Sequence, residues 1–151
     1  MRLYLDACCL NRPFDDQSQV RVRLESEAVL AICEEAGEKR WIILSSAALE
    51  FELARIPDPQ RRVRTQKFLL VARERTAVGL AESRRAKVLR ETYGLSALDA
   101  LHLACAQTLC ADVFLTTDDR LLRACRHMVA GEALFVVANP LTWLTAFLER
   151  E

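Results

Sequence analysis

Short runs of consecutive apolar residues alternate along this chain with longer segments in which apolar residues recur every three or four positions. The short runs predict buried strands, and the longer spacing predicts helices with one apolar face. A polar, proline-bearing stretch at 11–19 predicts a turn. The segments predicted to be extended are 3–5, 41–46, 77–80, 112–117 and 133–139. The segments predicted to be helical are 20–36, 47–56, 60–75, 81–93, 96–109, 118–125 and 140–149.

Several residues mark where these helices begin and end. Ser46 and Ser96 each precede a helical segment, and a serine oxygen can cap the first turn that follows it. Pro57 stops the first of these helices, because proline cannot continue the hydrogen-bonding pattern. Gly94 closes the helix before Ser96, and Pro140 suits a first helical position. These signals support the predicted order of elements.

Repeated alternation of short apolar strands with helices predicts crossover connections and a mostly parallel sheet covered on both faces. We therefore expect an α/β sandwich with four or five strands, formed as a single domain over residues 1–151. In such sheets, functional groups gather beyond the carboxyl ends of the strands. The sequence has no glycine-rich phosphate loop, so nucleotide-cofactor folds lose their main support.

Composition fits one ordered domain, because 52% of the 151 residues are hydrophobic and only four are Gly and four Pro. The 21 basic residues balance the 21 acidic ones, so overall charge does not indicate nucleic-acid binding. Residues 55–90 are different, with 11 basic and three acidic residues. This region predicts either solvated helix faces or a surface that contacts phosphate.

The sequence lacks the features of a signal peptide and of a membrane-spanning helix, so we expect a cytoplasmic protein with no membrane partner. Six cysteines are present, but none is in a CxxC pair. This spacing argues against structural zinc and disulfides, and it favours reduced, mostly buried thiols.

Acidic residues follow three of the predicted strands, at positions that share one edge of a parallel sheet. Asp99 joins them only if the start of its helix docks over the same edge. Several carboxylates in one cleft repel each other, so they need retained protons or bound divalent cations near pH 7. Mg²⁺ or Mn²⁺ is the natural occupant of an oxygen-only site. The acids that follow the strands are Asp6, Glu50 and Glu52, and Asp118 and Asp119.

Most of these acids also have a structural interpretation. Asp99 stands three residues after Ser96, as in a reciprocal capping pair. Asp118 and Asp119 in a first helical turn would be stabilised by the helix dipole. Asp6 is harder to explain in this way, because a carboxylate at the end of a buried strand needs a partner.

Two further choices concern helical faces. Glu50 and Glu52 lie on different sides of their helix, so only one can readily face the cleft, and we favour Glu52. His102 follows Asp99 by one turn on a largely apolar helix. A hydrogen-bonded core histidine is favoured there over a metal ligand or a proton shuttle.

Four motifs, "YLDACCLN", "EFEL", "LSALDALHLACA" and "FLTTDDRLL", occur in this order across the chain. Their order and spacing resemble those of PIN-domain proteins, especially the short stand-alone VapC-like toxins, and the resemblance covers essentially the whole chain. It implies a three-layer α/β/α sandwich with a parallel sheet. It also implies a Mg²⁺- or Mn²⁺-dependent ribonuclease, of a kind that a cognate antitoxin often inhibits.

The resemblance assigns roles to individual residues. Ala7 stands where many relatives carry Thr or Ser, so Asn11 and Thr116 are candidates for polar support of the site or of the scissile phosphate. Arg12 and the helix around 61–67 are candidates for binding the phosphate backbone. Glu50 remains a competitor for the second acidic position. The four metal-site acids implied by the motifs are Asp6, Glu52, Asp99 and Asp118.

The function predicted from these residues is hydrolysis of RNA phosphodiester bonds by the toxin of a toxin–antitoxin pair. Expected partners are an RNA substrate, an antitoxin protein and a second copy of the chain. The alternative is a non-catalytic module of the same fold that binds a protein or RNA. A phospho-acceptor receiver domain is rejected, because it needs a lysine after a late strand and the only lysines are Lys39, Lys67 and Lys87.

Overall fold

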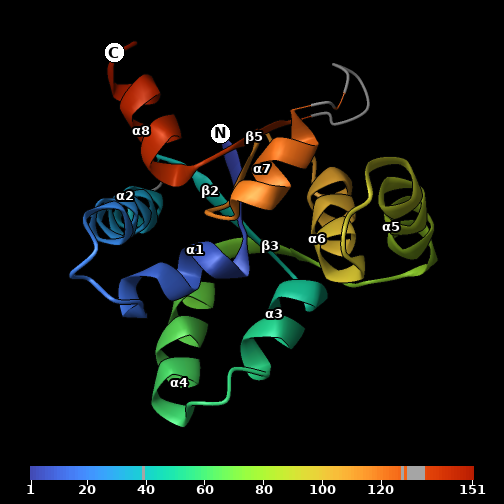
Figure 1. The fold of residues 1–151 in the computed structure, drawn as a ribbon, viewed down its shortest axis with the longest axis horizontal. Coiled ribbons are helices and arrows are strands. Elements are labelled where there is room, and N and C mark those ends of the chain that lie inside the picture. Colours follow the sequence, from blue (N-terminus) through green and yellow to red (C-terminus); the bar gives the residue numbers. More distant parts are fainter. Residues whose placement is uncertain (39, 127, 129–134) are drawn as a thin grey trace.

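The computed structural model describes residues 1–38, 40–126, 128 and 135–151. Five parallel strands form one sheet in the order β3-β2-β1-β4-β5, so the first strand of the chain is central (Figure 1). This confirms the predicted parallel sheet of four or five strands. The strands are β1 (Arg2–Leu5), β2 (Ile42–Ser46), β3 (Ala72–Thr76), β4 (Val113–Leu115) and β5 (Val136–Ala138).

Helices cover both faces of this sheet. In Figure 1, α2 and α8 lie on one side and α5 and α6 on the other, which confirms the three-layer α/β/α sandwich. Within the described ranges, no helix is both long and apolar enough to cross a membrane. The helices are α1 (Ala7–Asn11), α2 (Val20–Gly37), α3 (Ala47–Ala54), α4 (Pro59–Lys67), α5 (Leu80–Tyr93), α6 (Ala97–Thr108), α7 (Asp119–Cys125) and α8 (Pro140–Leu148).

The central strand owes its position to its apolar sequence. Leu3, Tyr4 and Leu5 are each at most 1% exposed, and β1 pairs with β2 on one edge and β4 on the other. The ring of Tyr4 stacks on Phe114 of β4, with 5.2 Å between the ring centroids. A strand buried on both faces needs such a continuous apolar run. The carboxyl end of β1, which Asp6 follows directly, therefore lies at the centre of the sheet, between the carboxyl ends of β2 and β4.

The helix signals in the sequence act as predicted. The Ser46 hydroxyl accepts a hydrogen bond from the Leu49 amide, and α3 begins there. Ser96 caps α6 in the same way. Gly94 ends α5 with a φ of 67°, a left-handed conformation that glycine adopts at little cost. Pro140 is the first residue of α8.

The predicted helix over 60–75 is wrong beyond Lys67. A 3₁₀ turn occupies Phe68–Val71, and 72–76 forms the edge strand β3 instead of the extended piece predicted at 77–80. The sequence of β3, "ARERT", has none of the apolar run that marks a buried strand. It belongs to the sheet through pairing with β2 and through an ion pair between Glu74 and Arg2 of β1. Tertiary pairing therefore overrides the local pattern here.

Two other boundaries differ from the prediction. The short helix α1 was not predicted; it ends at Asn11, and a 3₁₀ turn at Arg12–Phe14 then occupies the start of the region 11–19 that was expected to be a plain turn. The last predicted strand, 133–139, is observed as β5 over Val136–Ala138, and residues 133 and 134 lie outside the described ranges.

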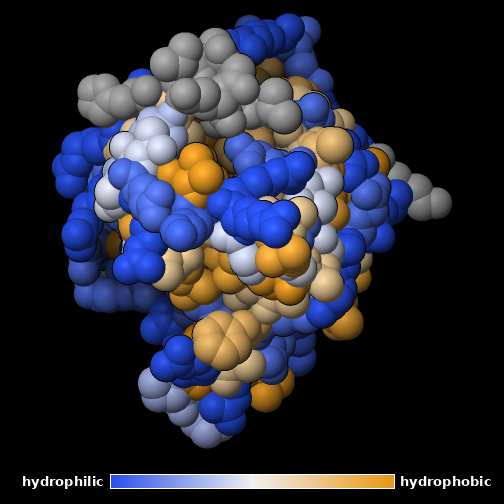
Figure 2. Space-filling model, turned by 90° about the vertical axis from the view of Figure 1, so that its right-hand side faces the viewer, coloured by the Kyte–Doolittle hydropathy of each residue, from blue (hydrophilic) through white to orange (hydrophobic). Residues whose placement is uncertain are grey.

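Four of the 11 basic residues in the region 55–90 lie on α5. Figure 2 shows the face on the α5 side of the molecule, where hydrophilic side chains surround smaller hydrophobic areas. The basic residues of α5 are exposed to solvent, as both a solvated helix and a phosphate-contacting surface require. They are Arg84, Arg85, Lys87 and Arg90.

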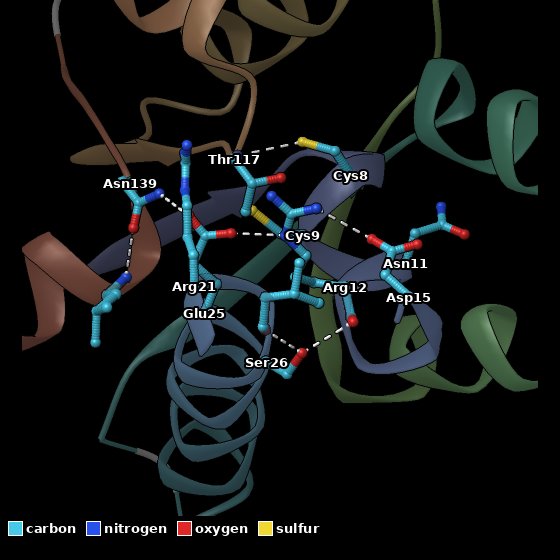
Figure 3. Close-up of polar contacts among 12 residues, drawn as sticks. Cys8, Cys9, Asn11, Arg12, Asp15, Arg21, Glu25, Ser26, Thr117 and Asn139 are labelled. Atoms are coloured by element: carbon cyan, nitrogen blue, oxygen red, sulfur yellow. Dashed lines mark hydrogen bonds and ion pairs between the residues drawn. The ribbon is translucent and has the colours of Figure 1, made fainter. Parts of the chain in front are cut away.

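A buried carboxylate joins α2 to the carboxyl edge of the sheet (Figure 3). Glu25 is 1% exposed and accepts hydrogen bonds from Arg12 Nε at 2.6 Å, Arg21 Nε at 2.8 Å and Asn139 Nδ2 at 2.7 Å. Burial raises the pKa of Glu25, but these three donors outweigh it and hold the pKa below its usual range. The network ties the turn after α1 and the residue before α8 to one side of α2.

Replacing Glu25 by Ala should lower the free energy of unfolding by about 3 kcal/mol, because Arg12 would lose its buried partner. Glu27→Ala is the matched control on the exposed face of the same helix, with an expected change within about 0.5 kcal/mol. Urea unfolding of both variants measures the difference. Equal stability of the two would contradict a structural role for the Glu25 network.

Candidate functional site

Asp6 lies at the carboxyl end of β1 and caps α1. Its Oδ1 accepts a hydrogen bond from the Ala7 amide at 2.8 Å, and its Oδ2 accepts one from the Thr116 hydroxyl at 2.9 Å. The residue is 5% exposed. Among the described residues, no lysine or arginine forms an ion pair with it. The carboxylate that the sequence left without a partner is therefore buried with hydrogen-bond donors but without a strong counter-ion.

Glu52 of α3 is the second acid beside Asp6. Its Oε2 lies 3.2 Å from Nε2 of His102, and ligand atoms of Asp6, Glu52 and His102 all lie within 4.8 Å of one another. Glu50 pairs instead with Arg75 of β3, with 2.6 Å between Oε1 and Nε. The structure thus brings Glu52 to Asp6 and directs Glu50 to another partner.

His102 is fully buried in α6 and has hydrogen-bond partners on both ring nitrogens. Nδ1 lies 2.8 Å from the Tyr4 hydroxyl, which is itself 2.7 Å from the Ser46 hydroxyl. These contacts agree with the predicted hydrogen-bonded core histidine. The same ring also borders the acids, since Nε2 is 4.0 Å from Asp6 Oδ1. In the sequence, the only sign that His102 would lie beside the acids was its placement one helical turn after Asp99.

Asp99 and Asp118 line a pocket of about 230 Å³ together with Arg120. Among the described residues, the cluster of ligand atoms within 4.8 Å of one another holds Asp6, Glu52 and His102 but neither of these two acids. Asp118 caps α7 by accepting hydrogen bonds from the amides of Arg120 and Leu121. Asp99 is in the first turn of α6, which Ser96 caps. Asp118 therefore caps α7, Asp99 lies in the first turn of α6 with its amide bonded to Ser96, and both acids line a common pocket.

Thr116 connects the two halves of the site. Its hydroxyl donates to Asp6 Oδ2 and accepts from the Asp118 amide at 3.1 Å. The Cys8 sulfur lies 3.2 Å from the same hydroxyl and accepts from the Thr117 amide. Thr116 is thus placed where polar support of the acids was expected from the motif after β4. Apart from the nearness of Cys8 to Asp6 in the chain, nothing in the sequence indicated that Cys8 would contact Thr116 and Thr117.

Asn11 and Arg12 are engaged in contacts within the protein (Figure 3). The Asn11 amide donates to the Ala7 carbonyl, and its oxygen accepts from Arg61 Nε at 3.0 Å. Arg12 pairs with Glu25 and with Asp15. Arg12 would therefore have to break these ion pairs in order to bind phosphate. The same holds for Arg61, which forms an ion pair with Asp15.

Burial and neighbouring negative charges raise the pKa of two of these acids, Asp6 and Asp99. Burial raises the pKa of Asp6, and the negative charges of Glu52 and Asp99 raise it further, against the opposing effects of His102 and the Thr116 hydrogen bond. Burial also raises the pKa of Asp99, with added repulsion from Asp118 and Glu52. A divalent cation would reverse this unfavourable balance, because it stabilises the ionised form of each carboxylate.

Comparison with known proteins identifies the family. The sequence model of the PIN domain matches residues 3–127. The chain belongs to the PIN-domain family. The resemblance stated from the four motifs is therefore confirmed. No curated protein gives a significant match to the full sequence.

Solved structures share the fold of this PIN domain. One is a chain in the crystal structure of VapBC2 from Rickettsia felis bound to a DNA fragment from their promoter. It has a TM-score of 0.61 and 14% identity, over 92% of this chain and 98% of that chain. Another is PAE2754 from Pyrobaculum aerophilum, with a TM-score of 0.55 and 18% identity over 100% of this chain and 91% of that chain. At these identities the likeness shows the fold alone.

Replacing Asp6 by Asn should leave the metal-free PIN domain at least as stable as the wild type. A gain on the order of 1 kcal/mol at neutral pH is expected, because Asn keeps the shape and removes the buried charge. The raised pKa of Asp6 means that the folded state binds more protons than the unfolded state. The Asp6 contribution to stability should therefore fall as pH rises from the ordinary carboxyl range through the raised pKa, so the stability of Asp6→Asn relative to the wild type should increase over that range.

Urea unfolding in EDTA between about pH 4 and pH 7 measures this difference. Asp119→Asn is the control, because Asp119 is exposed and pairs only across the surface with Arg21. A loss of about 3–5 kcal/mol in Asp6→Asn would instead identify Asp6 as half of a structural ion pair.

Proposed function

We propose that this PIN domain is a Mg²⁺- or Mn²⁺-dependent endoribonuclease that hydrolyses RNA phosphodiester bonds. The observation that carries the proposal is the buried carboxylate of Asp6, which Glu52 and Asp99 make less favourable and which no described lysine or arginine neutralises. Buried acids with perturbed pKa values cluster at functional sites, where a bound ligand offsets the cost of burying the charge. A divalent cation supplies the compensation.

The donor set fits such an ion. Asp6 and Glu52 have carboxylate oxygens close enough to share an ion, and Asp99 and Asp118 add two carboxylates in the pocket that they line. Carboxylate oxygens are hard ligands of the kind that Mg²⁺ and Mn²⁺ prefer. Glu52 is half-buried, with 34% of its side chain exposed, so an ion can be reached from solvent. When bound, the ion would neutralise charge on the scissile phosphate and lower the pKa of a water molecule.

The protein's own residues prepare the site for this chemistry. Hydrogen bonds from Ala7 and Thr116 fix both oxygens of Asp6, so the carboxylate is oriented before any ligand arrives. Thr116 holds the start of α7 at the same time, through the Asp118 amide. Arg120 is exposed at the pocket that Asp99 and Asp118 line, where its charge is placed to attract an RNA phosphate.

Cleavage of RNA should depend on Glu52 and not on Glu50. Glu52→Gln removes a charged ligand oxygen and should lower the rate on the order of 100-fold or more, as should Asp6→Asn. Glu50→Gln, two residues away on α3, breaks only an exposed ion pair with Arg75 and should retain activity. The assay uses single-stranded and structured RNAs with Mg²⁺, Mn²⁺ or EDTA, and circular dichroism confirms that each variant is folded.

Two results would overturn this assignment. If the Glu50 and Glu52 variants lost cleavage equally, the loss could not be attributed to a missing metal ligand. Folded wild-type protein that cuts none of the RNAs with either metal would favour the non-catalytic interaction module.

We also propose that the protein acts in the cytoplasm as the toxin of a toxin–antitoxin pair and forms a homodimer. The fold shared with a chain of the VapBC2 structure supports this role. Expression of the wild type alone should slow cell growth, and a small protein encoded beside it should bind it and restore growth. The Asp6→Asn variant should be harmless but still bind that protein. Toxicity that no neighbouring gene product relieves would contradict the pairing, and light scattering tests the dimer.

A further inference from the structure

We infer that His102 is a nitrogen ligand in the metal site, beside Asp6 and Glu52, and that the site therefore takes Mn²⁺ in preference to Mg²⁺. This inference rests on the metal site of the proposed function and adds a ligand that the four acids do not include. It assigns to a buried side chain a direct contact with the ion. The sequence alone favoured a purely structural role for the same residue.

The distances allow one ion to contact all three residues. Two ligand atoms that each lie about 2.1–2.2 Å from an ion are at most about 4.4 Å apart. Nε2 of His102 is 3.2 Å from Oε2 of Glu52 and 4.0 Å from Oδ1 of Asp6. Both separations lie within that limit. The full set of ligand atoms spans at most 4.8 Å, and the half-exposed Glu52 side chain can close the small remainder.

The surroundings of the ring are those of a metal-bound histidine. Such a histidine usually uses its second ring nitrogen in a hydrogen bond that fixes its orientation. Here Nδ1 meets the Tyr4 hydroxyl at 2.8 Å, and that hydroxyl meets Ser46 Oγ at 2.7 Å. Without a metal, Nε2–H donates to the Glu52 carboxylate, which can only accept, and Nδ1 accepts from the Tyr4 hydroxyl. A bound ion would take the place of the Nε2 proton. With a proton on Nδ1 instead, His102 donates to Tyr4 and Tyr4 donates to Ser46, which frees the Nε2 lone pair for the ion.

A nitrogen ligand changes which ion the site prefers. Mg²⁺ demands oxygen ligands and gives up its water reluctantly. First-row transition metals accept imidazole nitrogen readily. With His102 in the ligand set, Mn²⁺ should bind more tightly than Mg²⁺. If Nε2 kept its proton when the ion is bound, His102 would still donate a hydrogen bond to Glu52 and would not contact the ion, and this preference would not arise.

Electron spin echo spectroscopy of Mn²⁺ bound to the full-length protein tests the contact directly, because a coordinated histidine nitrogen modulates the echo. The sequence contains only two histidines, His102 and His127. Wild type and His127→Gln should show the nitrogen modulation, and incorporation of ¹⁵N-histidine should change it. His102→Asn should lose the modulation. Calorimetry should show at least about a tenfold loss of Mn²⁺ affinity in His102→Asn, with a smaller change for Mg²⁺.

The wild-type spectrum decides the question even if His102→Asn does not fold. Bound Mn²⁺ without any histidine modulation would overturn the inference and leave the proposed nuclease intact. Modulation that disappears in His127→Gln instead would also overturn it. Nitrogen-coupled Mn²⁺ in a protein that cuts no RNA would support the inference and count against the proposed function.

Discussion

The burial of the Asp6 carboxylate at the end of the central strand is the constraint on which the rest of this site depends. Removing such a charge from water costs several kcal/mol unless partners compensate. Hydrogen bonds from Ala7 and Thr116 offset part of this cost, and the nearby carboxylate of Glu52 adds to it. The position of β1 at the middle of the sheet makes the burial unavoidable, because strands pair on both of its edges. In the proposed function, a divalent cation offsets the remaining cost.

Glu25 shows how the same fold treats an acid whose role is structural. Both Glu25 and Asp6 are nearly inaccessible to solvent. Glu25 receives hydrogen bonds from two arginines and an asparagine, and its pKa falls below the usual range. Asp6 has no such partners among the described residues, and its pKa rises. Arginine partners thus stabilise the charge of Glu25, whereas Asp6 has hydrogen bonds from Ala7 and Thr116 but no arginine or lysine among the described residues. This contrast is the physical basis for proposing Asp6 as a ligand of a cation.

Much of the architecture follows from local patterns. Continuous apolar runs located the buried strands, and Ser46, Ser96 and Gly94 marked helix ends, because capping depends on residues a few positions apart. The edge strand β3 was missed, since its polar sequence joins the sheet only through pairing with β2. Strand-end placement also located the acids. The same logic could not show that Arg12 would be used by Glu25, because that ion pair joins segments that only the folded chain brings together.

Crystals of the PIN domain soaked in Mn²⁺ would show whether the carboxylates of Asp6 and Glu52 surround a divalent cation. Anomalous diffraction at the manganese edge should show a peak beside Asp6, about 2.1–2.3 Å from its carboxylate and from that of Glu52. The peak should be absent in Asp6→Asn crystals treated in the same way. Manganese density elsewhere on the protein, with the Asp6 carboxylate in unchanged contacts and no ion beside it, would contradict the account.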